Sequence, residues 1–236
     1  MGRIFEKRKD KMFARWAKMS KAFTKIGREI SMAVKAGGTN PDSNLRLRRA
    51  IQNAKSVNMP KDRVENAIKK AASKEDGDFQ ELIYEGYGPH GIAILVETAT
   101  DNPTRTVANV RMHFNKHKGS LGTGGSVAFM FERKGIFKLA APQGADLEAL
   151  ELELIDFGAE EFSVEDNDIL IYTTFADFST MQKHLEEKGL HPQLSVLQYL
   201  PTNSTDVSEA VELEVQSLID ALEDDDDVQA VYHNMK

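Results

Sequence analysis

Residues 135–200 read GIFKLAAPQGADLEALELELIDFGAEEFSVEDNDILIYTTFADFSTMQKHLEEKGLHPQLSVLQYL, and the order of periodic segments within this stretch decides the fold class. Apolar residues recur every three or four positions where a helix is expected, and they run together or alternate with polar residues where a strand is expected. The pattern predicts strands at 135–140, 160–165, 169–175 and 194–200, and helices at 146–157 and 177–188. The resulting order, β-α-β-β-α-β, is that of a ferredoxin-like domain.

The flanking segments predict further mixed structure. Strands are expected at 81–87 and 91–100. They precede Asn102-Pro103, which is typical of an N-cap followed by proline in the first helical turn. A last helix at 207–222 and a last strand at 228–235 are surplus to the ferredoxin-like order. We therefore expect the end of the chain to return and complete the domain that precedes residue 135.

The first third of the chain predicts helices only. Apolar residues recur at helical spacing up to Val34, and Gly37-Gly38 ends that helix because glycine adopts the left-handed conformation without strain. Pro60 separates two further helices. The fold class is thus α+β, with an N-terminal helical domain followed by two α/β domains of ferredoxin-like type, one inserted in the other. The expected domains are residues 1–77, residues 78–134 together with 206–236, and the inserted residues 135–205.

Charge is distributed unevenly along the chain. The 236 residues include 30 Lys and Arg against 37 Asp and Glu, which gives a net charge of −7. Residues 1–75 hold 20 of the basic and 7 of the acidic residues, so their net charge is +13 and that of the remainder is −20. A basic segment of this kind is typical of a protein that binds a polyanion. The alternative is a charged helix pair that docks on the acidic domains of its own chain.

Composition excludes several classes of protein. The chain has no cysteine, which rules out a disulfide scaffold, a thiolate zinc site, an iron–sulfur site and a cysteine nucleophile. No stretch approaches the ~18 apolar residues that a membrane span requires. The charged N-terminus lacks the apolar core of a signal peptide. We expect a protein of a reducing compartment with no membrane contact.

Several long motifs, in this order along the chain, resemble those of the YebC/PmpR family. They are FTKIGREISMAVKAGG (23–38), NLRLRRAIQNAKSVNMPKDRVENAIKKA (44–71), YEGYGPHGIAILVETATDNPTRTVANVR (84–111), NKHKGSLGTGGSVAFMFERKGIF (115–137) and VYHNM (231–235). The resemblance runs from about Lys18 to the C-terminus. The first residues differ, because MGRIFEKRKDKMFARW stands where the family opens with a segment resembling His-Ser-Lys-Trp.

This resemblance carries expectations about function. It implies a protein of the bacterial cytosol with three domains, no known catalysis and no cofactor. Some family members are described as DNA-binding transcriptional regulators. Others, including mitochondrial relatives of the type that activates translation of cytochrome oxidase, are similar to ribosome-associated factors that help translation through consecutive prolines. The expected partner is therefore DNA, or alternatively ribosomal RNA, and a monomer is favoured over an oligomer.

The candidate nucleic-acid-binding residues are cations, which neutralise phosphates and release counterions. The first set lies on two N-terminal helices and comprises Lys18, Lys21, Lys25, Arg28, Lys35, Arg46, Arg48, Arg49 and Lys55. The second set lies near the glycine-rich segment 119–125 and comprises Arg105, Arg111, Lys116 and Lys118. Among the interleaved aromatic residues Phe13, Trp16 and Phe23, we expect Phe23 to belong to the core. The alternatives are a solvated face for the first set and simple turn geometry for the second.

Other motifs do not indicate a catalytic or metal site. Residues 119–125 follow a helix and lack the Gly-Lys-Ser/Thr ending of a P-loop. His113 and His117 have helical spacing, but Phe114 stands where a zinc peptidase has glutamate. The acidic run 223–227 reads as a loop at a helix end, since aspartates there oppose the helix dipole. No nucleophile-elbow pattern is present, so we expect no catalytic residue, metal or cofactor.

Overall fold

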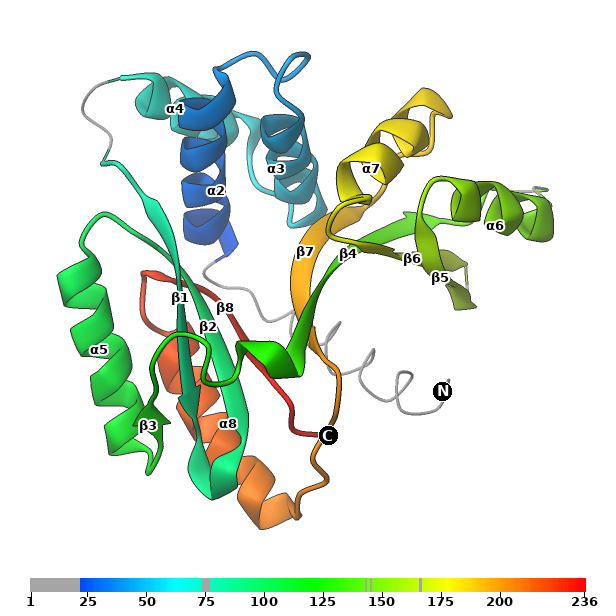
Figure 1. Cartoon of the computed structure of the whole chain (residues 1–236). Helices are drawn as coiled ribbons and strands as arrows, with labels where there is room; N and C mark the ends of the chain where they lie inside the picture. The colour runs from blue at the N-terminus through cyan, green and yellow to red at the C-terminus, as the bar shows by residue number, and fades with distance from the viewer. Residues whose placement is uncertain (1–21, 74–76, 143, 145, 166) are drawn as a thin grey trace. The chain divides into compact units, whose positions relative to one another are not determined.

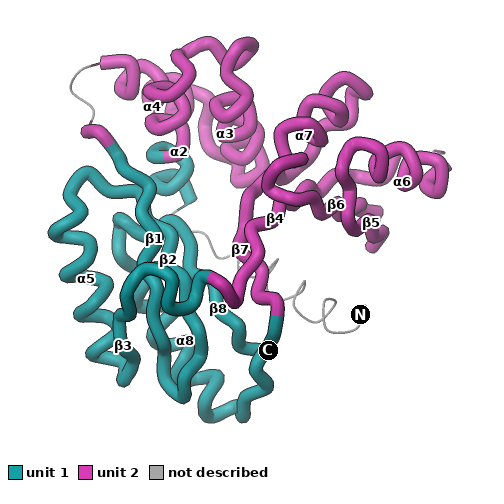
Figure 2. Tube along the Cα trace, in the orientation of Figure 1, with its two compact units in different colours: residues 1–28, 79–128, 203–236 teal, residues 29–78, 129–202 magenta. Residues whose placement is uncertain are grey.

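The computed structural model describes residues 22–73, 77–142, 144, 146–165 and 167–236. Helices come first along the chain and two antiparallel sheets follow, which confirms the predicted mixed fold class (Figure 1). By their contacts the residues divide into two compact units (Figure 2). Of the residues described, those within 22–28, 79–128 and 203–236 form unit 1, and those within 29–78 and 129–202 form unit 2. Within the described ranges, no helix combines the length and the apolar character that crossing a bilayer requires.

Three helices open the described chain. They are α2 (Ala22–Gly37), α3 (Leu45–Ser56) and α4 (Lys61–Ala72). Asn44 joins the first two, because its amide Nδ2 donates to the carbonyls of Ala33 and Gly38 while its Oδ1 accepts from Leu47 N and caps α3. Leu47 is fully buried in unit 2. The side chain of Asn44 therefore fixes both the end of α2 and the start of α3.

Unit 1 is built around a four-stranded sheet in the order β3-β1-β2-β8. Its strands are β1 (Gln80–Tyr87), β2 (Ala93–Thr100), β3 (Ser120–Leu121) and β8 (Val228–His233), and all three pairings are antiparallel. A short 3-10 helix, η1 (Pro89–Gly91), connects β1 to β2. Helices α5 (Pro103–Lys116) and α8 (Glu209–Glu223) share one apolar core with the sheet, in which Phe114 and Leu218 are fully buried.

Unit 2 contains the second sheet, in the order β5-β6-β4-β7. Its strands are β4 (Phe131–Ala140), β5 (Ala159–Glu165), β6 (Asp168–Thr174) and β7 (Leu194–Pro201). The first and third strands of the unit occupy the centre and all neighbours are antiparallel, as in a ferredoxin-like sheet. Helices α6 (Leu147–Asp156) and α7 (Phe178–Glu187) pack on one face of the sheet around Phe137.

One glycine in this sheet is required by close packing. A Cβ atom at Gly135 would lie 2.3 Å from the ring of Phe178 and 2.4 Å from Oγ1 of Thr173. The first residue of α7 therefore sits directly on the backbone of β4. This contact sets how closely the helix approaches the sheet.

Helix α3 meets the sheet of unit 2 at its β7 edge. The side-chain amide of Asn53 donates to Ser195 O at 2.8 Å and its Oδ1 accepts from Ser195 N at 3.1 Å. Ser195 and Asn53 are both buried. The amide thus satisfies the outward-facing backbone groups of an edge strand, which would otherwise be costly to bury.

The structure adds detail that the sequence patterns missed. β3 lies inside the segment expected to be a glycine-rich loop, and β4 begins at Phe131, four residues earlier than expected. A second 3-10 helix, η2 (Ala128–Met130), precedes β4. The division into two units does not test the predicted boundaries of the three domains, which stay a prediction.

Candidate nucleic-acid interface

The cations of α3 make specific contacts within unit 2. Nε of Arg48 lies 3.3 Å from Oε2 of Glu186, and Nη2 of Arg49 lies 3.5 Å from Oε1 of Glu29. The guanidinium of Arg49 also lies 5.2 Å from the ring centroid of Phe178, and its side chain is only 13% exposed. Arg49, a predicted nucleic-acid-binding residue, is thus largely buried, because this face of α3 packs against α7 and β7.

Two other candidates of the first set also have partners in their own unit. Nζ of Lys35 donates to Gly77 O and to Asp78, and this hydrogen bond and charge lower the pKa of the Asp78 carboxyl. Nζ of Lys25 donates to Gln229 O on β8 at 3.0 Å. Arg46 is half-buried, whereas Lys55 at the end of α3 is exposed.

Helix α4 carries exposed cations that the sequence analysis did not select. They surround the helix on the sides away from its buried residues Val64 and Ala71. With Lys55 they form what we call the α4 cation cluster, which comprises Lys55, Lys61, Arg63, Lys69 and Lys70. Helical periodicity was the signal available for it, since Val64 and Ala71 mark the inward side.

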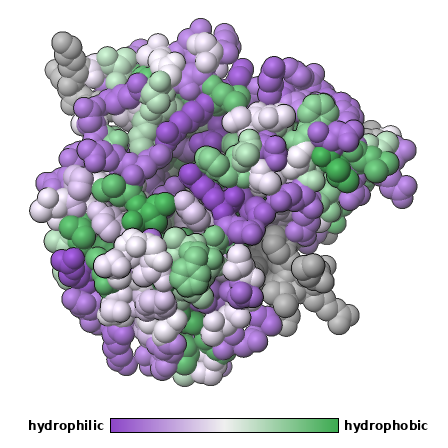
Figure 3. Space-filling view, in the orientation of Figure 1, coloured by the Kyte–Doolittle hydropathy of each residue, from purple (hydrophilic) through white to green (hydrophobic). Residues whose placement is uncertain are grey.

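The local charge balance of this cluster is strongly positive. Helix α4 holds four basic residues and two acidic ones, Asp62 and Glu65. Nζ of Lys61 lies 3.7 Å from Oε1 of Glu65, one turn along the helix. Hydrophilic residues cover much of the surface over α3 and α4 in Figure 3. The cluster is therefore a solvent-accessible positive surface that can approach phosphates.

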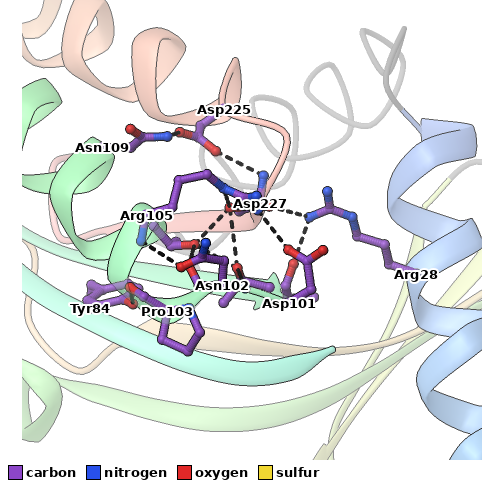
Figure 4. A network of polar contacts seen from close by, with 12 residues as sticks. Arg28, Tyr84, Asp101, Asn102, Pro103, Arg105, Asn109, Asp225 and Asp227 are labelled. Atoms are coloured by element: carbon purple, nitrogen blue, oxygen red, sulfur yellow. Dashed lines mark hydrogen bonds and ion pairs between the residues drawn. The ribbon is translucent and has the colours of Figure 1, made fainter. Parts of the chain in front are cut away.

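Arg28 and Arg105 converge on one buried carboxylate in unit 1. Nη2 of Arg105 donates to both carboxylate oxygens of Asp227, at 2.9 and 2.8 Å, and Nη1 of Arg28 donates to Oδ1 at 3.1 Å. Figure 4 shows the two guanidiniums reaching Asp227 from different helices. The Thr106 hydroxyl donates to Oδ2 at 2.7 Å. These two arginines, predicted to bind nucleic acid, are thus already paired within the chain.

The surroundings of Asp227 hold it in the ionised form. Burial alone would raise the pKa of this carboxyl, but hydrogen bonds from Arg105 and Thr106 and the charges of Arg105 and Arg28 outweigh it and lower the pKa. Only 3% of the side chain is exposed. The last residue of the acidic run is therefore a buried anchor that joins α2, α5 and the start of β8.

The second predicted set is spread along α5, with Arg105 in its first turn, Arg111 in its middle, and Lys116 and Lys118 at its C-terminal end. Arg111, Lys116 and Lys118 are exposed. A shallow hollow of about 340 Å³ is lined there by Lys116, His117, Lys118, Leu213, Glu214 and Ser217. Glu214 offsets the positive charge, because its carboxylate lies 3.3 Å from Nζ of Lys118 and 3.6 Å from Nε2 of His90. This region is consequently less positive than the α4 cation cluster.

The last residue of the glycine-rich segment and the residues just after it form an anion nest, which the Glu85 carboxylate fills. The carboxylate of Glu85 on β1 accepts from the amides of Gly125, Val127 and Ala128 at 2.6, 2.8 and 2.7 Å. Burial would raise the pKa of Glu85, but these three hydrogen bonds lower it. The amides that a phosphate would need are therefore already engaged, in agreement with the absence of a P-loop motif.

Some of the residues singled out in the sequence lie outside the described ranges. Lys18 and Lys21, like Phe13 and Trp16, lie outside the described residues, and Phe23 is half-buried. Among the residues described, no three His, Asp or Glu side chains are grouped as ligands of a metal ion. The expected lack of catalysis and cofactor stays a prediction.

Comparison with known families decides the relationship of the chain. Residues 3–74 match the model of the TACO1/YebC protein N-terminal domain, and residues 79–235 match that of the TACO1/YebC second and third domain. The chain belongs to the TACO1/YebC family. The N-terminal match starts well before Lys18, so the TACO1/YebC likeness extends into the segment that the motifs had suggested was divergent.

Relatives across the TACO1/YebC family span the whole chain. A protein of Myxococcus xanthus is 56% identical over 240 residues, with complete coverage of both chains. A protein of Flavobacterium johnsoniae is 53% identical over 236 residues, covering 100% of this chain and 99% of its own. Both are named as probable transcriptional regulatory proteins, which is the name of a regulator and not of an enzyme.

A solved structure supports the fold of this TACO1/YebC chain. The crystal structure of a conserved hypothetical protein from Aquifex aeolicus superimposes with a TM-score of 0.78 at 40% sequence identity. The match covers 93% of this chain and 91% of the other.

Proposed function

We propose that this chain is a nucleic-acid-binding regulatory protein that contacts phosphates through the α4 cation cluster. The observation that carries the proposal is the concentration of exposed cations on α4 and the end of α3. Residues 22–73 hold 11 Lys and Arg against 4 Asp and Glu. Such a surface supplies affinity for the nucleic-acid backbone without reading its sequence.

The first form of the proposal is DNA-binding control of transcription. The names of the relatives support it, since the Myxococcus xanthus and Flavobacterium johnsoniae proteins are both called probable transcriptional regulatory proteins. In this form the protein would bind duplex DNA, and the α4 cation cluster would provide most of the salt-dependent affinity.

The second form is action on the ribosome through contacts with ribosomal RNA, which would relieve stalling at proline-rich stretches. It is favoured by the way the exposed cations are distributed. Those of α4 lie on several sides of the helix and Lys55 lies at the end of α3, so they do not line one helix face of the kind that enters a major groove. Cations spread in this manner suit the irregular phosphate surface of a folded RNA.

A binding experiment tests the role of the α4 cation cluster. The variant Lys55→Glu with Lys69→Glu reverses two exposed cations, and Lys183→Glu is a matched control on α7, where the lysine side chain is 73% exposed. Fluorescence anisotropy would give the affinity for a DNA duplex and for an RNA hairpin between 50 and 200 mM salt. We expect the slope of log K against log salt to fall by about 1 for each phosphate that the double variant no longer neutralises, and to stay unchanged in the control. An unchanged slope in the double variant contradicts the proposal.

A cellular experiment separates the two forms. Ribosome profiling with and without the gene would show pausing at consecutive prolines on deletion if the protein acts in translation. Pausing that does not respond to deletion, together with a sequence-specific DNA footprint of the purified protein, would decide for transcription.

A further inference from the structure

Three side chains of unit 2 form a stack across neighbouring strands. On one side of β4, Arg133 is paired with Tyr199 of β7. On the other side, Lys134 is paired with Thr174 at the end of β6, so the next residue, Phe175, lies beside Arg133. The guanidinium carbon of Arg133 lies 4.7 Å from the ring centroid of Phe175 and 5.5 Å from that of Tyr199. The arginine is thus flanked by two aromatic rings.

This stack lies on the same face of the sheet as α6 and α7, but on a part of that face that the two helices do not cover. Side chains alternate along a strand, so Arg133 shares a face with Phe137, which packs under α6 and α7. Phe178, the first residue of α7, covers Gly135, which is one step along that face from Arg133. Arg133 and its neighbours Tyr199 and Phe175 therefore lie beyond the start of α7.

The exposure of Phe175 follows from this position. Phe175 is 52% exposed, although a phenylalanine side chain has no polar group to offer to water. The cation–π contact with Arg133 holds the ring on one side and leaves its remaining surface accessible. A large aromatic ring presented in this way favours a planar ligand.

We propose that Phe175, Arg133 and Tyr199 form a stacking site for an unpaired nucleobase. The inference deepens the function proposed above and rests on it. A base would stack on the accessible part of Phe175, next to the delocalised charge of Arg133, and would be bound without regard to its hydrogen-bonding edge. Bases within a duplex have both faces covered by their neighbours, so the site would select single-stranded segments.

The stack makes a contribution different from that of the α4 cation cluster. Cations bind the phosphates of any strand, whether or not it carries bases. A stacking site needs the base itself. A strand of abasic residues has the same length and phosphate charge as an ordinary strand, so it isolates the stacking contribution.

The test compares labelled 12-nucleotide strands of oligouridine and of abasic residues by fluorescence anisotropy. Phe175→Leu keeps an apolar side chain but removes the ring. Phe129→Leu is the matched control, because Phe129 is 75% exposed in the same unit and the Arg133 contacts do not include it. We expect Phe175→Leu to weaken oligouridine binding at least about fivefold, the low end for loss of one stacked base, and to leave abasic binding unchanged. Phe129→Leu should change neither.

A second variant guards against a change in folding. In Phe175→Trp a larger ring replaces the first, so oligouridine binding should be retained and the added indole emission should be quenched by oligouridine but not by the abasic strand. Equal effects of Phe175→Leu on both strands, or none on oligouridine, would overturn the stacking site while leaving the role of the α4 cation cluster intact. Failure of the wild-type protein to bind any strand or duplex would overturn both proposals.

Discussion

Replacing Asp227 by asparagine should destabilise unit 1 more than any other change in the acidic run 223–227. The substitution preserves volume and removes the charge that Arg28 and Arg105 share. Removing one partner of a buried ion pair costs about 3–5 kcal/mol, because the other charge is left without compensation. The Arg105 side chain is 47% exposed and can regain water, whereas that of Arg28 is 15% exposed. We therefore expect a loss at the lower end, about 3 kcal/mol.

Urea denaturation followed by circular dichroism would measure this loss, and hydrogen exchange would locate it. For a chain of this size, the same loss corresponds to a fall in Tm of about 6–12 °C. Amides of β2 and α5 should lose protection first, because Asp227 contacts both elements. Asp226→Asn is the matched control, since this exposed neighbour in the run should change stability by less than about 0.5 kcal/mol. If Asp227→Asn also changed the free energy of unfolding by less than about 0.5 kcal/mol, the anchoring role of Asp227 would be refuted.

The effect of pH gives a second check on the same residue. The pKa of Asp227 is lowered in the folded protein, so its stabilising contribution is present above the pKa of the unfolded chain, about 3.9. The contribution is lost as pH falls through the lower pKa of the folded state. The gap in stability between the wild type and Asp227→Asn should thus be constant near neutral pH and should narrow below about pH 4. A gap that widens in acid would contradict this assignment.

Two further predictions concern the loop of unit 1 and the sheet of unit 2. Glu85→Gln should cost about 2 kcal/mol, because a charged acceptor of three backbone amides is lost, and hydrogen exchange should show faster exchange at Gly125, Val127 and Ala128. Unchanged protection there would contradict the nest. Gly135→Ala should cost at least about 2 kcal/mol by overpacking against Phe178, whereas Gly124→Ala, where nothing lies within 4 Å of the added Cβ, should be nearly neutral by urea denaturation. Equal stability of these two variants would show that α7 can move away from β4.

The sequence predicts the fold better than it predicts side-chain partners. Each strand and helix of unit 2 from β4 to β7 carries its own periodic signal and turn residues, so the ferredoxin-like order could be read locally. β3 could not, because Ser120 and Leu121 are too short a strand to show alternation. Its existence depends on pairing with Gly86 and Tyr87 of β1, which is a tertiary contact.

The charged residues show why the candidate site was harder to predict. Charge alone selected Arg49 as a candidate for nucleic-acid binding, but a guanidinium also stacks on an aromatic ring, and the ring of Phe178 lies far away in the sequence. Asp227 was read as part of a polar loop because its partners Arg105 and Arg28 are 122 and 199 positions away. Local patterns hold no information about contacts at that separation.

The pairing of β8 with β2 has a consequence for how the protein is made. Ala99 N donates to Asp227 O at the end of this pairing, and these two residues are separated by 128 positions. At about 5–20 residues per second, the ribosome needs roughly 6–26 s to synthesise the chain between them. The sheet of unit 2 has all its strands within residues 131–201 and can close first, whereas the sheet of unit 1 has to wait for β8 at Val228–His233. A product of translation interrupted before residue 227 would therefore lack both β8 and the carboxylate that pairs with Arg28 and Arg105, so the sheet of unit 1 can form only after this segment has been synthesised.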